Sequence, residues 1–215
     1  MNIIVCGVGG QGVLLFSDLI GNIALAAGLD VKKSEVHGMA QRGGSVTTHV
    51  RYAPKVYSPL VEEGSADLVV AFEKLEALRH VHFLAGNGWL VYDPHRIDPL
   101  PVLLGLVERP TDALLDERIM ARAPRRLVVS AFEAAREIGD PRVQNVVMLG
   151  AVSRLLEFPR SVFRDIIRLQ VKPGFVDLNL RAFDRGLAIG SSYDIGAGAS
   201  YMGRVTPQCP GQTGF

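Results

Sequence analysis

The hydrophobic and polar positions at the start of the chain follow strand and helix patterns in turn. Residues 2–6 are apolar and β-branched, which predicts a strand buried on both faces. A largely apolar segment of helix length runs from about residue 11 to residue 27, and Gly28 is a natural helix stop. Residues 31–35 are expected to form the next strand. This order predicts a βαβ unit with a right-handed crossover over a parallel sheet.

The next segments add strands to this sheet. Residues 45–52 alternate strictly, so one face of that strand is wholly polar and carries Ser45, Thr47, His49 and Arg51. Further short apolar runs cover residues 68–71, 89–92 and 127–129, separated by helical patterns at 73–80 and 111–122. We therefore expect a mostly parallel, Rossmann-like sheet in a three-layer αβα fold of the α/β class.

The C-terminal third of the domain is expected to be helical. Helical patterns cover residues 132–138, 144–156, 161–169 and 177–188, with prolines between them. Residues 191–215 contain five glycines and two prolines and no periodicity. The sequence thus predicts one α/β domain over residues 1–190 and a flexible tail over 191–215, with a partner-docking arm as the alternative for the tail.

Composition narrows the classes of partner. The chain has 23 Lys and Arg against 22 Asp and Glu, and this net charge of +1 gives no field for holding nucleic acid or an acidic membrane. Residues 13–27 include Ser17, Asp18 and Asn22, so they fall short of a membrane span, and the N-terminus lacks a signal-peptide pattern. Cys6 and Cys209 have no disulfide or zinc spacing. We expect a cytoplasmic protein.

A glycine-rich turn follows the first strand. Gly7, Gly9 and Gly12 have the G-x-G-x-x-G spacing, which permits a tight turn and a close approach to a diphosphate. The helix start behind them offers unpaired N–H groups and a positive dipole end, so the turn is a candidate anion site. Glu35, 23 residues beyond Gly12, lies where dinucleotide folds place a ribose-binding acid. The alternative is that these glycines only permit a tight turn.

A basic stretch without acids follows the second strand. Residues 36–61 contain no Asp or Glu but carry Arg42, Arg51 and Lys55, together with His37 and His49. Beside the glycine turn, such a segment would add charge-assisted contacts to a bound phosphate or carboxylate. A solvated surface loop followed by an exposed strand face explains the composition equally well.

Few other residues indicate chemistry of their own. Neither His37 nor His49 has a Cys, Asp or Glu at ligand spacing, so no metal site is expected. Asn145 begins a helix and is interpreted as a cap, or alternatively as an interface or ligand contact. No nucleophile elbow, Walker lysine or iron–sulfur cysteine spacing is present. We therefore assign no catalytic residue.

Three segments together resemble a known family. Gly7-Val-Gly-Gly-Gln-Gly12, Ser34-Glu-Val-His-Gly-Met-Ala-Gln-Arg-Gly-Gly-Ser45 and Thr48-His-Val-Arg51 are similar to the gamma-type subunit of 2-oxoacid:ferredoxin oxidoreductases. Within that family the likeness is greatest to the small (beta) subunit of the indolepyruvate enzymes. It extends through residues 144–150 and 179–186, and so covers about residues 1–190.

The resemblance implies a division of labour. A larger subunit would bind thiamine diphosphate and 4Fe-4S clusters, decarboxylate an arylpyruvate such as indolepyruvate, pass electrons to ferredoxin and leave the acyl group on coenzyme A. This chain would be non-catalytic and would help to line the approach of coenzyme A. The residues so implied are Gly7, Gly9, Gly10, Gln11, Gly12, Gln41, Arg42, Gly43, Gly44 and Asn145. Related single-chain pyruvate enzymes are basic around residues 40–42, where only Arg42 keeps the charge here.

Two other functions fit parts of the pattern. A free-standing NAD(P)- or flavin-dependent oxidoreductase would explain the glycines and Glu35, although not the loop that follows. An assembly scaffold without a ligand would explain the lack of catalytic residues. The 2-oxoacid, the stoichiometry and any homodimer are left open.

Overall fold

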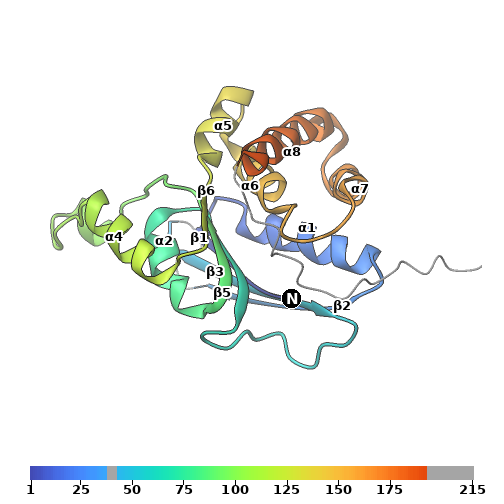
Figure 1. Ribbon diagram of the computed structural model, residues 1–215. Coiled ribbons are helices and arrows are strands. Elements are labelled where there is room, and N and C mark those ends of the chain that lie inside the picture. Colours follow the sequence, from blue (N-terminus) through green and yellow to red (C-terminus); the bar gives the residue numbers. More distant parts are fainter. Residues whose placement is uncertain (38–42, 193–215) are drawn as a thin grey trace, which may run out of the picture.

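The computed structural model describes residues 1–37 and 43–192. In these ranges the chain forms a six-stranded sheet with helices on both faces (Figure 1), as expected for a three-layer αβα fold. The strand order is β2-β3-β1-β4-β5-β6. The strands are β1 (Asn2–Val8), β2 (Asp30–His37), β3 (Ser45–Ala53), β4 (Ala66–Ala71), β5 (Leu84–Tyr92) and β6 (Arg126–Val128).

The sheet differs from the predicted βαβ unit because β2 is not the strand next to β1. β1, β4, β5 and β6 are parallel, but β3 is antiparallel to both β1 and β2 and lies between them. The crossover from β1 to β2 therefore skips one position. The short connection over residues 38–44 accounts for the pairing of β3 with β2, because a strand that follows so few residues after β2 can pair with it only as an antiparallel neighbour. The pairing of β3 with β1 on its other side is decided by tertiary packing.

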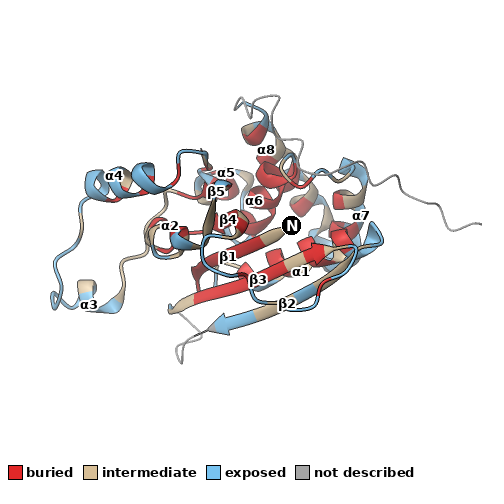
Figure 2. Ribbon diagram, turned by 60° about the horizontal axis from the view of Figure 1, so that its bottom comes forward, coloured by how far each residue is buried: buried red, intermediate tan, exposed pale blue. Residues whose placement is uncertain are grey.

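Alternate residues of β1 face the two helical layers. Ile3 and Val5 point to the side covered by α1 (Val13–Ala26) and the C-terminal helices, whereas Ile4 and Cys6 point to the side of α2 (Lys74–His80) and α4 (Asp112–Arg122). Figure 2 shows the resulting buried centre of the sheet. No described helix is both long and apolar enough to cross a bilayer.

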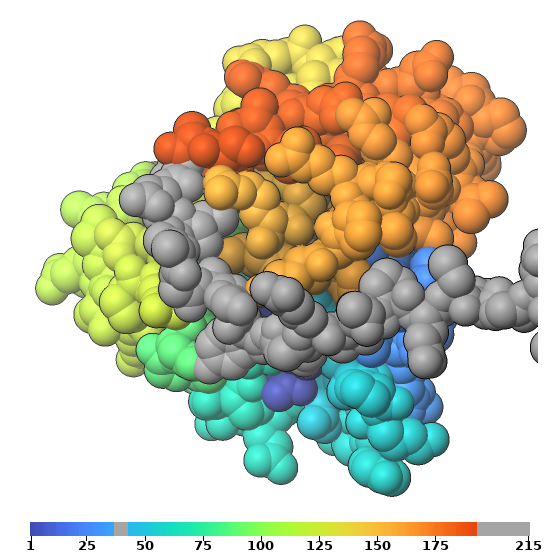
Figure 3. Space-filling view, turned by 45° about the vertical axis from the view of Figure 1, so that its right-hand side comes forward, coloured from blue at the N-terminus to red at the C-terminus, as the bar shows by residue number. Residues whose placement is uncertain are grey.

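The helical C-terminal third is confirmed. It consists of α5 (Ala131–Ile138), α6 (Gln144–Val152), α7 (Arg160–Gln170) and α8 (Val176–Ser191), with 3-10 turns at Pro141–Val143 and Pro173–Phe175. The orange and red residues of this part pack together on one side of the molecule (Figure 3). The helix expected over 144–156 ends earlier, at Val152. The predicted tail falls, beyond Ser192, outside the described residues.

Two short elements complete the second layer. One is the 3-10 turn Val81–Phe83 before β5, and the other is α3 (Leu100–Leu103), which the sequence patterns did not predict. α3 lies within a long connection between β5 and α4 that projects from the edge of the sheet (Figure 2).

Candidate functional site

The glycine turn follows β1 as predicted and begins α1. Gly10 and Gly12 have φ values of 110° and 78°, in the left-handed region that favours glycine. Gly12 is the residue before the helix, and its carbonyl accepts the first helical hydrogen bond, from Phe16 at 3.0 Å. The first turn of α1 has no acidic side chain and no side-chain cap. An anion at this helix start would meet uncapped N–H groups and no opposing charge.

The turn lies at the switch point of the sheet. From β1 the chain passes over one face through α1, whereas β4, β5 and β6 are connected through α2 and α4 on the other face. The chain therefore leaves the paired carboxyl ends of β1 and β4 toward opposite faces of the sheet. In open α/β sheets this crevice is where ligands bind.

Gln11 joins the turn to the end of β4. Its Oε1 accepts a hydrogen bond from the Val8 amide at 2.8 Å, and its Nε2 donates to the Phe72 carbonyl at 2.9 Å. Both ends of the amide are thus occupied by the backbone of the chain. The Gln11 side chain holds the turn in place, and any contact it makes with a ligand is additional to this role.

A second glutamine shares the Phe72 carbonyl. Gln144 Nε2 donates to that oxygen at 3.1 Å and to Asp93 Oδ2 at 2.9 Å. Asp93, just after β5, also accepts from the amides of Phe132 at 2.7 Å and His95 at 2.9 Å. Burial raises the pKa of Asp93 despite these donors. Sequence reasoning missed both residues, although a carboxylate directly after a buried strand was a signal for Asp93.

Asn145 lies directly behind Gly12. A Cβ atom on residue 12 would be 2.6 Å from Asn145 Nδ2, so the turn and α6 can meet only because residue 12 is glycine. Asn145 is buried, and its Oδ1 accepts from the Val146 amide at 2.9 Å. It is the second residue of α6, whose N-cap is Val143, so the interpretation of Asn145 as the N-cap was wrong. A ligand or interface contact stays a prediction.

The end of the acid-free loop lies beside the glycine turn. The Gly9 amide donates to the Gly44 carbonyl at 2.8 Å, and the Gly43 amide donates to the Gly9 carbonyl at 3.3 Å. Gly43 itself has a φ of 75°. These bonds extend the pairing of β1 with β3 and bring Gly43 and Gly44 to the candidate site. Gln41 and Arg42 lie outside the described residues.

The rest of the basic stretch lies at the opposite end of the sheet. Because β3 runs antiparallel to β1, Ser45 is near the glycine turn and Arg51 pairs with Asn2 at the start of β1. Arg51 Nη1 donates to the carbonyls of Ser58 and Leu60, at 3.0 and 3.1 Å. Lys55 lies 3.9 Å from Asp30. Arg51 and Lys55 are therefore remote from the glycine turn and cannot contribute to a ligand bound there.

The polar face of β3 is mostly buried, which contradicts the alternative of an exposed strand face. Ser45 Oγ donates to Glu76 at 2.5 Å, and Thr47 Oγ1 lies 2.7 Å from His80 Nε2 on α2. His49 Nδ1 accepts from the Val61 amide at 3.1 Å. Burial lowers the pKa of His49 and of His80.

Cys6 is buried between the sheet and α2. Burial raises the pKa of the Cys6 thiol, whose sulfur contacts the Glu76 carbonyl at 3.6 Å. Within residues 1–37 and 43–192, no group of three or more His, Cys, Asp and Glu is arranged to hold a metal.

Glu35 does not occupy the place of a ribose-binding acid. It lies on β2, with β3 between that strand and β1, and its carboxylate is 2.8 Å from Lys33 Nζ. A dinucleotide fold places this acid on the strand next to β1. The inserted β3 therefore removes the structural basis of the NAD(P) alternative.

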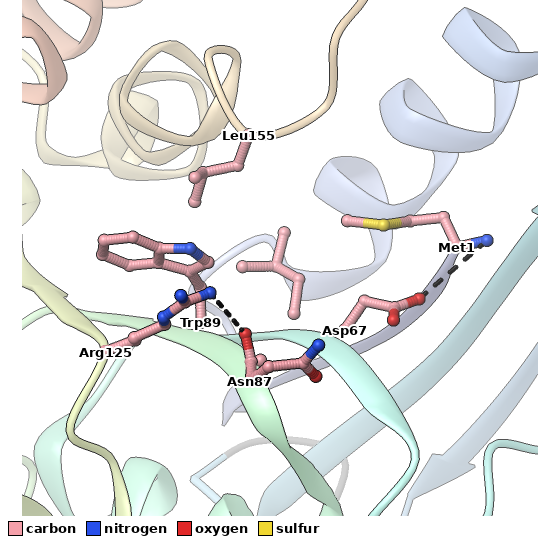
Figure 4. A pocket seen from close by; sticks show the side chains of 8 residues that line it. Met1, Asp67, Asn87, Trp89, Arg125 and Leu155 are labelled. Atoms are coloured by element: carbon pink, nitrogen blue, oxygen red, sulfur yellow. Dashed lines mark hydrogen bonds and ion pairs between the residues drawn. The ribbon is translucent and has the colours of Figure 1, made fainter. Parts of the chain in front are cut away.

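A small cavity lies at the end of the sheet opposite to the glycine turn. It is bordered by Met1, Asp67, Trp89 and Arg125 at the amino ends of the strands, and by Leu155 (Figure 4). Arg125 donates to the Asn87 carbonyl at 3.1 Å, and the N-terminal amine is 4.0 Å from Asp67. None of the sequence-predicted site residues lines this cavity.

Comparison with known proteins identifies the family. Residues 2–189 match the pyruvate ferredoxin/flavodoxin oxidoreductase family. The indolepyruvate oxidoreductase subunit IorB of Thermococcus kodakarensis is 40% identical over 192 residues, which cover 86% of this chain and 94% of that protein.

Solved structures show the same fold. The gamma subunit of a keto/oxoacid ferredoxin oxidoreductase from Geobacter sulfurreducens has a TM-score of 0.65 at 21% identity, covering 89% of this chain and 99% of that one. The 2-oxoglutarate:ferredoxin oxidoreductase from Magnetococcus marinus, with 2-oxoglutarate, coenzyme A and succinyl-CoA bound, has a TM-score of 0.70 at 22% identity. It covers 90% of this chain, but this chain covers only 31% of it. The resemblance noted in the sequence is thus confirmed, and the chain belongs to the pyruvate ferredoxin/flavodoxin oxidoreductase family.

Proposed function

We propose that this chain is the small, non-catalytic subunit of an indolepyruvate-type 2-oxoacid:ferredoxin oxidoreductase. The observation that carries the proposal is the likeness to the IorB subunit, which extends over 94% of that subunit's length. A larger subunit would supply thiamine diphosphate and the 4Fe-4S clusters, which perform the decarboxylation and carry electrons to ferredoxin. The assignment of no catalytic residue to this chain fits that division of labour.

We further propose that the glycine turn, the loop with Gln41 and Arg42, and Asn145 face coenzyme A or the partner's active site. Three features of the chain support this location. The turn lies at the switch point of the sheet, α1 starts there without a side-chain cap or an acid, and Gly43 and Gly44 are hydrogen-bonded to Gly9. A phosphate of coenzyme A would be stabilised there by backbone N–H groups and by the Arg42 guanidinium.

Steady-state kinetics of the assembled complex test this role. Arg42→Ala should raise the Michaelis constant for coenzyme A by at least about tenfold, because a charge-assisted contact to phosphate contributes roughly 1.5–3 kcal/mol. Thiamine diphosphate binding should not change. The matched control is Arg168→Ala, which removes an exposed arginine of α7 that pairs with Asp165. An unchanged Michaelis constant in Arg42→Ala would count against the coenzyme A contact.

Purification from the native host tests the subunit assignment itself. A tagged chain should retain a larger protein that contains thiamine diphosphate and iron–sulfur clusters. Recovery of the chain alone, together with saturable binding of NADH in a thermal-shift titration, would instead favour a free-standing oxidoreductase.

A further inference from the structure

The connection between β5 and α4 carries an apolar segment that the site does not use. Residues 99–107 read Pro-Leu-Pro-Val-Leu-Leu-Gly-Leu-Val and include no charged or polar side chain. Five of these residues are more than half exposed, with Leu103 at 70% and Leu106 at 74%. The other three are Leu100, Leu104 and Val107. We call residues 94–111 the apolar arm.

The base of the apolar arm is held to the domain by an ionic cluster. Arg96 lies 2.9 Å from Asp98 and 3.3 Å from Asp112, and Arg109 lies 2.7 Å from Asp98. Asp112 is also 3.2 Å from Lys74 on α2. The amide of Ile97 donates to the buried Glu73 carboxylate at 3.1 Å. These contacts fix the position from which the arm projects.

The tip of the arm has a defined backbone. The amides of Val102 and Leu103 donate to the Pro99 carbonyl, and that of Leu106 donates to the Pro101 carbonyl. Two prolines restrict the backbone further. The tip therefore presents its leucines in a fixed arrangement, which reduces the entropy lost when a partner binds.

Exposed apolar side chains packed this closely mark a site of interaction. The arginines and aspartates at the base pair with one another or with Lys74. The arm therefore offers a partner an apolar tip that is followed by the exposed carboxylate of Glu108. A stable interface buries roughly 800 Å² on each side, which is more than a nine-residue tip supplies. The occupant must therefore also contact the body of the domain.

These features favour a larger polypeptide over a second copy of the chain. The groove between α5 and α8 of this chain mixes apolar residues such as Ala134 and Ile189 with charged ones. An apolar tip seated there would take Glu133, Glu137 and Arg185 out of water, which is costly. In the Magnetococcus structure the matching domain is about a third of a longer chain. The rest of that chain is a larger polypeptide joined to the same fold, which is the kind of partner that the arm would need.

We propose that the apolar arm docks in an apolar groove of the larger subunit. This inference rests on the proposed function, because that function supplies the larger subunit. The contact is made by the leucines of the tip, and its strength should depend little on salt.

Binding measurements with the purified larger subunit of the same complex test the proposal. The variant Leu103→Asp/Leu106→Asp should raise the dissociation constant at least tenfold. The control Leu25→Asp/Leu169→Asp introduces the same charge at two leucines that are 55% and 77% exposed on α1 and α7, and it should bind like the wild type. Raising NaCl from about 0.1 to 0.5 M should weaken the wild-type complex by less than twofold.

Several results would overturn the proposal. One is wild-type affinity in the arm variant, and another is an equal loss in the control. A dimer of the isolated chain that the arm variant abolishes would assign the arm to a second copy. If the Asp pair alters circular dichroism, Leu103→Ser/Leu106→Ser replaces it. Failure of the coenzyme A role would appear as normal assembly with an unchanged Michaelis constant in Arg42→Ala, so the two failures are distinguishable.

Discussion

Gly12 and Asn145 meet so closely that the missing Cβ of residue 12 leaves the space that the Asn145 amide occupies. That Cβ would lie 2.6 Å from Nδ2, and Gly12 also has a φ of 78°. Gly12→Ala should therefore lower the free energy of unfolding by about 2–4 kcal/mol, since backbone strain and a steric clash add. Urea unfolding of the isolated chain measures this loss.

Gly28→Ala is the matched control. Gly28 has nearly the same φ, 79°, but a Cβ there meets no atom within 4 Å. Gly28→Ala should lower the free energy of unfolding only by the backbone strain, roughly 1–2 kcal/mol. The variant Gly12→Ala/Asn145→Ala should recover part of the loss, because it removes the clashing amide. Equal losses in the two single glycine variants would mean that the contact with Asn145 has no energetic weight.

Gln11 and Gln144 should be energetically coupled, because both donate to the Phe72 carbonyl. Each single change to Ala leaves that oxygen with one donor and should cost about 1–2 kcal/mol. The double variant leaves it with neither glutamine and should cost about 0.5–2 kcal/mol more than the sum. Denaturant unfolding of the four proteins in this cycle gives the coupling energy.

A distant pair provides the reference for this cycle. Gln11→Ala combined with Arg168→Ala should be additive within about 0.5 kcal/mol, since Arg168 lies on α7 and pairs with Asp165. Additivity in the Gln11/Gln144 cycle as well would show that the shared carbonyl does not link the two residues.

His49 should make stability depend on pH. Its Nδ1 accepts from the Val61 amide, and burial lowers its pKa below the ordinary value of 6.5. As pH falls through about 6.5, the unfolded chain binds a proton that the folded chain does not, so stability falls. The slope is at most about 1.4 kcal/mol per pH unit for this histidine.

The comparison of wild type with His49→Gln isolates this effect, because Asp93 and Glu73, whose pKa values are raised by burial, contribute with the opposite sign. Between pH 8 and pH 5 the free energy of unfolding should fall more for the wild type than for His49→Gln. Parallel pH curves would exclude this role of His49.

The sequence predicted the elements well where each residue pattern was local. The glycine turn, α1 and the four C-terminal helices were all found, because periodicity and glycine spacing encode them directly. The insertion of β3 between β1 and β2 was not, since which strand pairs with β1 is decided by tertiary packing. The missed insertion explains why Glu35 looked like a ribose-binding acid. Arg51 and Lys55 were grouped with Arg42 on composition alone, which does not show at which end of the sheet a residue lies.

The candidate site was predictable only in part, for a similar reason. Gly9 and Gly44 are 35 residues apart, and the family resemblance placed both at one site, but no local spacing predicted the hydrogen bond between them. The roles of Asp93 and Gln144 were missed because these residues meet across 51 positions of the chain, and Gln144 also meets the Phe72 carbonyl. The position of Asp93 directly after a buried strand was a local signal, but its partners in the buried network were not encoded locally.

The packing of α6 on α8 is the strongest test of the fold itself. A Cβ on Gly186 would lie 1.9 Å from the Val147 carbonyl oxygen, and one on Gly150 would lie 2.1 Å from that of Phe183. Backbone atoms cannot move aside as a side chain can, so Gly186→Ala must separate the two helices. We expect a loss of at least about 3 kcal/mol in the free energy of unfolding.

Gly174→Ala is the control for this change. Gly174 lies in the 3-10 turn Pro173–Phe175, where a Cβ meets no atom within 4 Å, so its stability should change by less than about 0.5 kcal/mol. Because α6 begins with Gln144 and Asn145, a shift of α6 should also disturb the glycine turn. Gly186→Ala should therefore weaken coenzyme A use by the complex, and a destabilised variant with normal coenzyme A kinetics would show that α6 does not position the site.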